Sequence, residues 1–575
     1  MFTSEPMKRL LLLFLLISQY SQAQLVSVQG IVKDAKDKTA LSFCSVAIKG
    51  TGKGTLTNED GGFTITVDTQ KDTLAFYYLG YKKKDVPASA IQENGEVLLK
   101  EIVNNLQEVT IRYDEERLYN ILLTCKKQLE ERKAINSKAY YQLETKINND
   151  PVEMLECYYN ARVKGSTIQQ LLYKNGRVGL SKYDGKYFAS MNTSRAIQYL
   201  DLTHESPFLP DIPLQQNKEK MMAEYTLRQL PSDETTHHIE FIPKKNKRAQ
   251  FKGDIWIDKE SSAILKIEMS CDSAAIHPFK ADGLDKLGYV SMFIKHTYQA
   301  EDGPGPLQHI DFSYQFDYID KYKTDKKVVA KPAKRARTKG VVYFYDFKRP
   351  FIAPYYKYDT KEEDYEKIAM LPYNASFWEN AEGLMHTEEQ QRSLEFLASN
   401  GQLMNFKSRN TAGERIAYRD FVEVNSLLWS DTTRIFLTRE RDPMQQTKPY
   451  QLQAQIYMDL VLDGDSVRHF SVSVFDVKNT YFSTLGDKVN CLVNVYFDIF
   501  EIERLKMEDK LEGRQYTVEE IDEIYKRTAK NAERIGARFL EEVDRGQNEE
   551  AMKKWNQYVF ENLEIDNMKT FKLSW

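Results

Sequence analysis

Apolar and polar side chains alternate in one segment after another between Ala139 and Lys348, as in strands that bury one face. One helical stretch, Glu115–Lys133, precedes these segments and carries its apolar residues near one face. The alternating segments are 140–147, 153–163, 167–173, 239–243, 253–257, 263–270, 289–298, 309–318 and 340–348. This order predicts an antiparallel, curved sheet wrapped on a helix, within residues 112–350.

The length of 575 residues is too great for one hydrophobic core, so several domains are expected. We expect a multidomain α+β protein. The expected division is a signal peptide at 1–23, a β-sandwich at 24–111, the helix and sheet at 112–350, a helical connector at 351–410 and an α+β domain at 411–575. The net charge of −4 provides no overall field that would select nucleic acid as a partner.

The first residues predict export. Lys8 and Arg9 are followed by an apolar run at 10–17, and small residues at 21–23 offer a cleavage site. The run is shorter than the roughly 20 residues that a spanning helix needs. The mature chain is therefore expected to begin near Gln24, without a transmembrane segment. Its expected location is the periplasm or the periphery of the outer membrane, in soluble form.

Residues 26–82 alternate between short strands and turns. The glycines after Asp60 mark a hairpin turn, because such a turn needs positive φ. The segment resembles the carboxypeptidase regulatory-like domain, through Gly30, Val32, Asp34, Gly50, Thr51, Gly54, Thr57, Asn58, Asp60, Gly61, Phe63, Gly80 and Tyr81. The resemblance implies a β-sandwich that serves as an interaction or spacer module. In Gram-negative, Bacteroidetes-type envelopes such domains often precede TonB-dependent outer-membrane proteins, and Leu106–Ile111 resembles the usual exit strand.

A hairpin at 251–267 resembles the lipoprotein-sorting half-barrel group, whose members can hold acyl chains. A purely structural sheet is the other interpretation of this hairpin, and the sequence favours it.

The segment Lys321–Lys339 is rich in cations and carries one acidic residue, Asp325. We expect a long, mobile hairpin tip there. Its cations are candidates for contact with anionic lipid or polysaccharide, namely Lys326, Lys327, Lys331, Lys334, Arg335 and Arg337. The alternative, which the sequence favours, is a solvated loop that keeps an edge strand soluble.

The C-terminal region predicts a strand pair, a helix at 490–511, and a second helix that opens with a capping box at Thr517–Glu520. This order resembles a family of secreted bacterial zinc-protease-like domains over residues 415–563. The identities are Phe497, Asp498, Ile499, Glu501, Arg504, Glu542, Gly546 and Trp555.

The resemblance implies that the metal site is degenerate. Leu492 and Tyr496 stand where the two helical histidines would bind zinc, Val493 replaces the general base, and Arg545 replaces the third histidine. A pseudo-enzyme without metal or cofactor is therefore expected. Leu492 and Val493 should fill the vacated centre, and Arg545 should pair with Glu542 or Asp498.

The other metal and redox candidates are weak. His237 and His238 are neighbours on a strand and should point to opposite faces, while His469 should be an ordinary histidine of its strand. The five cysteines are far apart, so buried free thiols are expected, although one disulfide remains possible.

Three functions remain open. The first is a non-catalytic envelope binding or scaffold protein with an unknown protein or peptide partner. The second is an accessory protein of outer-membrane transport or lipid handling. The third is a hydrolase with an unrecognised site.

Overall fold

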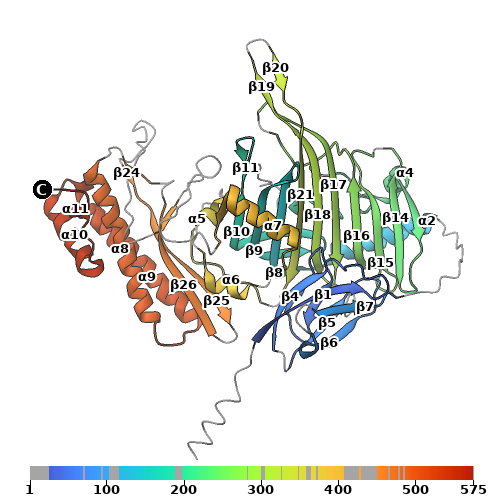
Figure 1. The fold of residues 1–575 in the computed structure, drawn as a ribbon, viewed down its shortest axis with the longest axis horizontal. Helices are drawn as coiled ribbons and strands as arrows, with labels where there is room; N and C mark the ends of the chain where they lie inside the picture. The colour runs from blue at the N-terminus through green and yellow to red at the C-terminus, as the bar shows by residue number, and fades with distance from the viewer. Residues whose placement is uncertain are drawn as a thin grey trace, which may run out of the picture.

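The computed structural model describes residues 25–573, except for 69–70, 92–94, 103–114, 188–196, 246, 282, 300–304, 325–326, 348, 358–363, 371–372, 382, 407–425, 429–449, 464–465, 477–479 and 483–485. The predicted signal peptide, the exit strand at 106–111 and Lys326 lie outside the described residues. Three units follow one another along the chain, of which the first two are built mainly of strands and the third of helices with a few strands (Figure 1).

The first unit packs two sheets around one apolar core, as expected of the N-terminal domain. Its strands are β1 Leu25–Asp34, β2 Ser45–Ile48, β3 Gly54–Leu56, β4 Gly62–Asp68, β5 Thr73–Tyr77, β6 Lys84–Pro87 and β7 Gly95–Leu99, with the short η1 at Ala88–Ala90. The sheet orders are β4-β1-β7 and β3-β2-β5-β6. The turn at Asn58 is held by its Oδ1, which accepts from the backbone NH groups of Asp60 (3.0 Å) and Gly62 (2.7 Å). Gly61 has a φ of +76°, which explains the glycine.

The second unit is an eleven-stranded antiparallel sheet. Its order is β13-β14-β15-β16-β17-β18-β21-β8-β9-β10-β22. The strands are β8 Ala134–Ile147, β9 Asp150–Lys164, β10 Thr167–Leu180, β13 Tyr225–Leu230, β14 Thr236–Pro243, β15 Lys252–Asp258, β16 Ile264–Cys271, β17 Lys286–Tyr298, β18 Leu307–Ile319, β21 Lys334–Tyr345 and β22 Gln402–Met404. Shorter elements are β11 Lys182–Tyr183, β12 Lys186–Tyr187, η2 Pro213–Gln215 and α4 Lys218–Glu224.

One helix, α2 (Glu115–Glu131), lies behind this sheet, as predicted (Figure 1). Its buried residues Leu118, Leu122, Cys125 and Leu129 join the same apolar cluster as the inner-face residues of the sheet. The face of the sheet that packs in this cluster is called the inner face here, and the opposite one the outer face.

Other parts of the chain cover much of the outer face. The connector helices α6 Ala375–Asn380 and α7 Glu388–Asn400 cover the outer face at β8–β10 (Figure 1). The preceding helix of the connector, α5 Asp364–Met370, packs instead in the inner-face cluster through Tyr365 and Ile368. The first unit docks beside α6 and α7, where Leu56 packs with Tyr140 and Tyr343 in one apolar cluster. Lys339 forms an ion pair with Glu59 at 3.0 Å across this contact.

The segment predicted as a mobile loop at 321–339 is mostly strand. The finger, defined here as β19 (Lys321–Lys323) paired with β20 (Val328–Ala330), continues β18 and β21 beyond the rest of the sheet. Residues 334–339 belong to β21 itself and pair with β18 and β8. The prediction of a loop was therefore wrong for residues 334–339. Their alternation of buried and exposed side chains was not recognised in the sequence, because many of these residues are cations.

In its described residues, the third unit contains two small sheets, ordered β23-β26-β25 and β24-β27, and four α-helices. Its elements are β23 Ser426–Leu428, β24 Tyr450–Gln451, β25 Ala454–Asp463, β26 Ser466–Asp476, β27 Tyr481–Phe482, α8 Asp487–Leu511, α9 Val518–Glu542, η5 Asp544–Gly546, α10 Glu549–Leu563 and α11 Asn567–Thr570. The capping box at Thr517 and Glu520 forms as predicted. All five cysteines are buried and free.

Candidate functional site

The register of β21 separates its cations. Arg335, Arg337 and Lys339 are exposed, and the alternate residues Ala336 and Thr338 are buried. The exposed row lies on the outer face, because Arg335 pairs across from Asp317 of β18 and Lys339 contacts the first unit. Three of the cations in the predicted anion-binding segment therefore come from a rigid strand rather than from a loop.

The candidate cations have different environments. Lys327 and Lys331 are exposed on or beside the finger. Lys334 is buried and forms ion pairs with Asp320 (2.7 Å) and Asp184 (2.8 Å). Burial lowers the pKa of its ammonium, but hydrogen bonds to the two carboxylates outweigh burial and hold the pKa above its usual value. Lys334 is therefore a structural cation and not part of an exposed binding surface.

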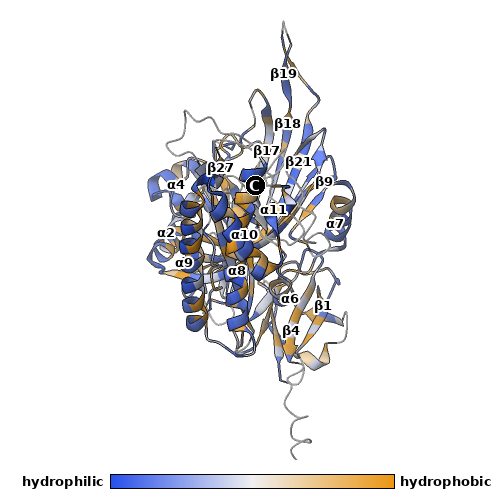
Figure 2. Ribbon diagram, turned by 90° about the vertical axis from the view of Figure 1, so that its left-hand side faces the viewer, coloured by the Kyte–Doolittle hydropathy of each residue, from blue (hydrophilic) through white to orange (hydrophobic). Residues whose placement is uncertain are grey.

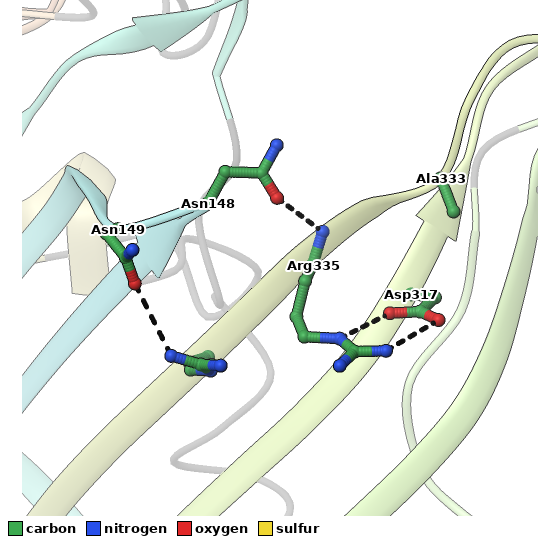
Figure 3. A pocket seen from close by; sticks show the side chains of 6 residues that line it. Asn148, Asn149, Asp317, Ala333 and Arg335 are labelled. Atoms are coloured by element: carbon green, nitrogen blue, oxygen red, sulfur yellow. Dashed lines mark hydrogen bonds and ion pairs between the residues drawn. The ribbon is translucent and has the colours of Figure 1, made fainter.

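A hollow opens on the outer face where neither the first unit nor the connector covers the sheet. We call it the amide–arginine pocket. Its volume is about 470 Å³, and it is lined by Asn148, Asn149, Asp317, Ala333, Arg335 and Arg337 (Figure 3). Five of the six lining residues have polar or charged side chains, which favours a polar ligand.

The hairpin tip between β8 and β9 forms one wall of this pocket. Asn148 and Asn149 both have positive φ, as a tight two-residue hairpin turn requires. The backbone NH of Arg335 donates to Asn148 Oδ1 at 3.0 Å, and the backbone NH of Asn148 donates to Arg335 O at 3.0 Å (Figure 3). The tip is thereby fixed to β21, so the pocket wall is preorganised.

The two arginines of the pocket differ in their partners. The guanidinium of Arg335 binds both carboxylate oxygens of Asp317, at 2.8 and 3.1 Å, and this carboxylate raises the pKa of Arg335. Arg337 donates to two neutral groups, Gln315 Oε1 at 3.1 Å and Asn149 Oδ1 at 3.4 Å. No carboxylate in the described part of the chain forms an ion pair with Arg337. The pocket therefore keeps one uncompensated positive charge.

The four degenerate metal-site positions lie on α8 and η5. Leu492 and Val493 are fully buried in the core of the third unit. Leu492 lies against η5, because a Cβ built on Gly546 would be 3.6 Å from its Cδ1. Tyr496 packs on Gly536 of α9, and burial raises the pKa of its hydroxyl to about 12. Leu492 therefore lies against the turn that holds Arg545.

The prediction for Arg545 was wrong. Its side chain is largely exposed, and its nearest acidic partner is Asp544, with 3.9 Å between Nε and Oδ1. Glu542 accepts instead from the indole of α10 at 2.8 Å, and Asp498 accepts from an asparagine of α11 at 2.6 Å. Arg545 has a left-handed backbone in the η5 turn, with φ +58°, and the turn leaves its side chain in solvent.

The third unit also holds a serine, a histidine and a carboxylate together. His469 Nε2 lies 2.8 Å from Glu508 Oε2, and Ser471 Oγ donates to the other oxygen of the same carboxylate. A hydrolytic triad needs the histidine between the nucleophile and the acid. Here the acid lies between the two, so the cluster is not arranged to activate Ser471.

Two buried polar centres were not predicted from the sequence. In the first, Lys174 of β10 pairs with Asp459 of β25. In the second, Glu156 of β9 accepts from Arg177 Nε at 2.5 Å and lies 3.0 Å from His386 Nε2 of the connector. Both centres join segments that are far apart in the sequence. The signal that could have indicated them is a charged residue within a predicted strand, such as Glu156 or Asp459.

In the part of the chain that the structure describes, no group of three or more His, Cys, Asp or Glu side chains could hold a metal ion. Within the same residues, no helix is long and apolar enough to cross a membrane.

Comparison with known families identifies the first unit. Residues 28–111 match the CarboxypepD_reg-like domain, which confirms that part of the predicted resemblance. TonB-dependent receptor P3 of Formosa agariphila is 33% identical over 109 residues, 19% of this chain and 11% of the receptor. TonB-dependent receptor SusC of Bacteroides thetaiotaomicron is 36% identical over 89 residues, 16% of this chain and 8% of the receptor. The chain therefore covers only a small part of either relative. The resemblance of residues 415–563 to zinc-protease-like domains stays a prediction.

Solved structures resemble larger parts of the chain weakly. MucB in complex with MucA, from Pseudomonas aeruginosa, covers 39% of this chain and 93% of its own, with 8% identity and a TM-score of 0.15. A DUF1329 family protein from Desulfovibrio piger covers 41% and 95%, with 12% identity and a TM-score of 0.17. At these TM-scores neither likeness bears on the function of this chain.

Proposed function

We propose that this chain is a non-catalytic binding protein of the cell envelope, and that its amide–arginine pocket holds an acidic carbohydrate. The observation that carries the proposal is the uncompensated charge of Arg337 in a polar pocket of about 470 Å³. A planar guanidinium binds a carboxylate through two parallel hydrogen bonds. The asparagine amides beside it can donate to and accept from hydroxyl groups.

The position of the pocket supports a binding role. The pocket is built on β8, β9, β18 and β21, which are paired strands of the large sheet, so its walls are rigid. A preorganised site loses less conformational entropy when it binds its ligand. The only wholly apolar side chain in the lining is that of Ala333, which disfavours a lipid chain as the occupant.

The envelope location rests on two features. The N-terminal residues have the pattern of a signal peptide, and residues 28–111 match a domain that is shared with two TonB-dependent receptors. We infer that the first unit of this chain works in the same compartment as those receptors.

The absence of catalysis is part of the proposal. Leu492 and Val493 occupy the places of a zinc ligand and a general base in the resemblance, and both are buried among apolar residues. Neither side chain has a lone pair to offer a metal. The third unit would then be a scaffold that is attached to the sheet.

A second candidate is an accessory role in outer-membrane transport. The observation that favours it is the shared N-terminal domain of the two TonB-dependent receptors. Chemical cross-linking in intact cells tests it, and recovery of such a receptor bound to the first unit is the supporting result. Lipid handling is less favoured, because α2 packs on the inner face and fills it with its own apolar side chains.

A thermal-shift panel tests the carbohydrate proposal. Oligogalacturonate should raise the melting temperature of the purified protein, and above its Kd the rise should follow the logarithm of its concentration, since a ligand that binds only the folded state stabilises it. Neutral malto-oligosaccharides of the same length should leave it unchanged. Equal stabilisation by both, or by neither, contradicts the proposal.

A further inference from the structure

The finger projects beyond the end of the large sheet that lies away from the first unit. Figures 1 and 2, seen from directions at right angles, both show it as the extreme point of the molecule at that end. Its register pairs Tyr322 with Val329 and Lys323 with Val328. Residues directly opposite in an antiparallel pair lie on one face. Tyr322 and Val329 therefore share one face, and Val328 lies on the other.

Large apolar side chains are exposed on both faces of this finger. Tyr322 is 47% exposed and Val328 is 51% exposed. A strand that packs against a protein core would be apolar on one face only. Exposed apolar groups on both faces favour insertion of the finger, tip first, into an apolar environment that surrounds it on all sides.

A second exposed apolar pair lies near the base of the finger. Leu284 and Tyr289 flank the start of β17, and both are exposed. The backbone NH of Lys321 donates to Asp285 Oδ1 at 2.6 Å, which places this segment beside the finger. The apolar surface at this end of the sheet therefore extends beyond the two strands of the finger.

The charge around the finger is positive. Lys323, Lys327 and Lys331 are exposed, and no carboxylate in the described residues forms an ion pair with any of them. Lys321 lies beside Lys286, and desolvation together with this second ammonium lowers the pKa of Lys321. This local excess of exposed cations favours contact with a negatively charged surface.

We propose that the finger docks the protein onto an anionic lipid bilayer, with Tyr322 and Val328 in the interfacial layer and the three lysines among the lipid head groups. Tyrosine suits that layer because its ring is apolar and its hydroxyl is polar. Lysine can place its apolar stem below its charge. A soluble acidic polymer would balance the charge but would not take up the exposed apolar side chains.

This docking is independent of the amide–arginine pocket and sets an orientation for the molecule. The first unit lies at the opposite end of the sheet strands, so it would be held away from the bilayer (Figure 1). The finger adds a membrane contact to a chain in which no described helix is long and apolar enough to cross a membrane.

Vesicle co-sedimentation of the full purified protein tests the proposal. Vesicles of equal parts phosphatidylcholine and phosphatidylglycerol should bind it, and vesicles of phosphatidylcholine alone should bind it at least tenfold more weakly. Replacing Lys323, Lys327 and Lys331 with alanine should weaken binding by roughly fivefold for each lysine. The matched control replaces Lys245, Lys247 and Lys530, which are exposed elsewhere, and changes the net charge equally. Equal losses in the two triple variants would overturn the proposal.

A second measurement separates insertion from adsorption. The native cysteines are buried, so Val328→Cys provides one accessible thiol for an environment-sensitive fluorophore. Its emission should shift to the blue on phosphatidylglycerol vesicles and stay unshifted with soluble oligogalacturonate. Tyr322→Ser combined with Val328→Ser should weaken vesicle binding at least fivefold while the melting temperature stays unchanged. An unshifted probe on vesicles, or full binding by the serine variant, would overturn the insertion of the finger.

Discussion

The ammonium group of Lys174 on β10 lies against the carboxylate of Asp459 on β25, 285 residues later in the chain. Their side chains are only 2% and 0% exposed. Lys174 also donates to the carbonyl oxygens of Ile352 (2.7 Å) and Leu460 (3.0 Å), and Asn374 of the connector donates to Asp459 at 3.1 Å. The sheet, the connector and the third unit thus meet at one fully hydrogen-bonded, buried ion pair.

Breaking this pair should destabilise the protein strongly. Asp459→Asn or Lys174→Met should each lower the free energy of unfolding by about 3–5 kcal/mol, because a lone charge stays buried. The double variant Lys174→Met with Asp459→Leu should lose less than the sum of the two. Urea unfolding measures all three. Asp85→Asn, which breaks the exposed pair with Lys49, is the control and should cost at most about 1 kcal/mol. Additive losses would show that the two side chains are not coupled.

The second buried centre should give a pH-dependent stability. Burial alone would raise the pKa of Glu156, but the charges of Arg177 and His386 outweigh it and hold the pKa well below its usual range. A glutamate has a pKa of about 4.3 in an unfolded chain. The stabilisation is therefore complete above about pH 4.3 and is lost as the pH falls through the lower folded-state value.

Unfolding measured as a function of pH tests this assignment. Glu156→Gln should be less stable than the native chain at neutral pH, and the difference should shrink as the pH falls below about 4. Glu523→Gln, on the exposed face of α9, is the control and should follow the native profile. Parallel profiles for Glu156→Gln and the native chain would rule out Glu156 as the source of the pH dependence.

The interior of the third unit depends on the side chain at the degenerate zinc position. Leu492→Ala should cost about 2–5 kcal/mol, because it opens a cavity against η5. Leu505→Ala lies on the same helix at a partly exposed position and should cost far less, about half a kcal/mol. Chemical denaturation compares the two, and similar costs would mean that the centre of this unit is not tightly packed.

Metal content tests the proposed loss of the protease site. The purified protein should carry no stoichiometric zinc by elemental analysis, and chelators should leave its melting temperature unchanged. This follows from Leu492, Val493 and Arg545 at the places of the ligands and the base. One tightly held zinc per chain, lost together with a peptidase activity, would refute the pseudo-enzyme proposal.

Local signals in the sequence predicted local structure well. The Asn58–Gly62 turn, the face of α2 that carries Leu118 and Leu122, and the Thr517 capping box all formed as expected. Each signal depends on residues within one or two turns of one another, so propensity and spacing are enough to predict it.

The long-range contacts could not be predicted in the same way. Lys334 has the same charge as its neighbours, and only the register of β21 shows that it is buried while Arg335 and Arg337 are exposed. The pocket needs the β8–β9 tip beside β21, which is a contact between residues 187 positions apart. A single sequence carries periodicity but does not carry the pairing of distant strands.

Calorimetric titration of the purified protein with oligogalacturonate tests the binding proposal most directly. The account predicts saturable binding with one site per chain, weakening as salt is added, because the contact is between charges. Arg337→Gln should lower the affinity at least tenfold, and Arg527→Gln, which removes an exposed arginine from α9, should leave it unchanged. Absence of saturable binding, or equal affinity in the Arg337 variant, would contradict the assignment of this pocket.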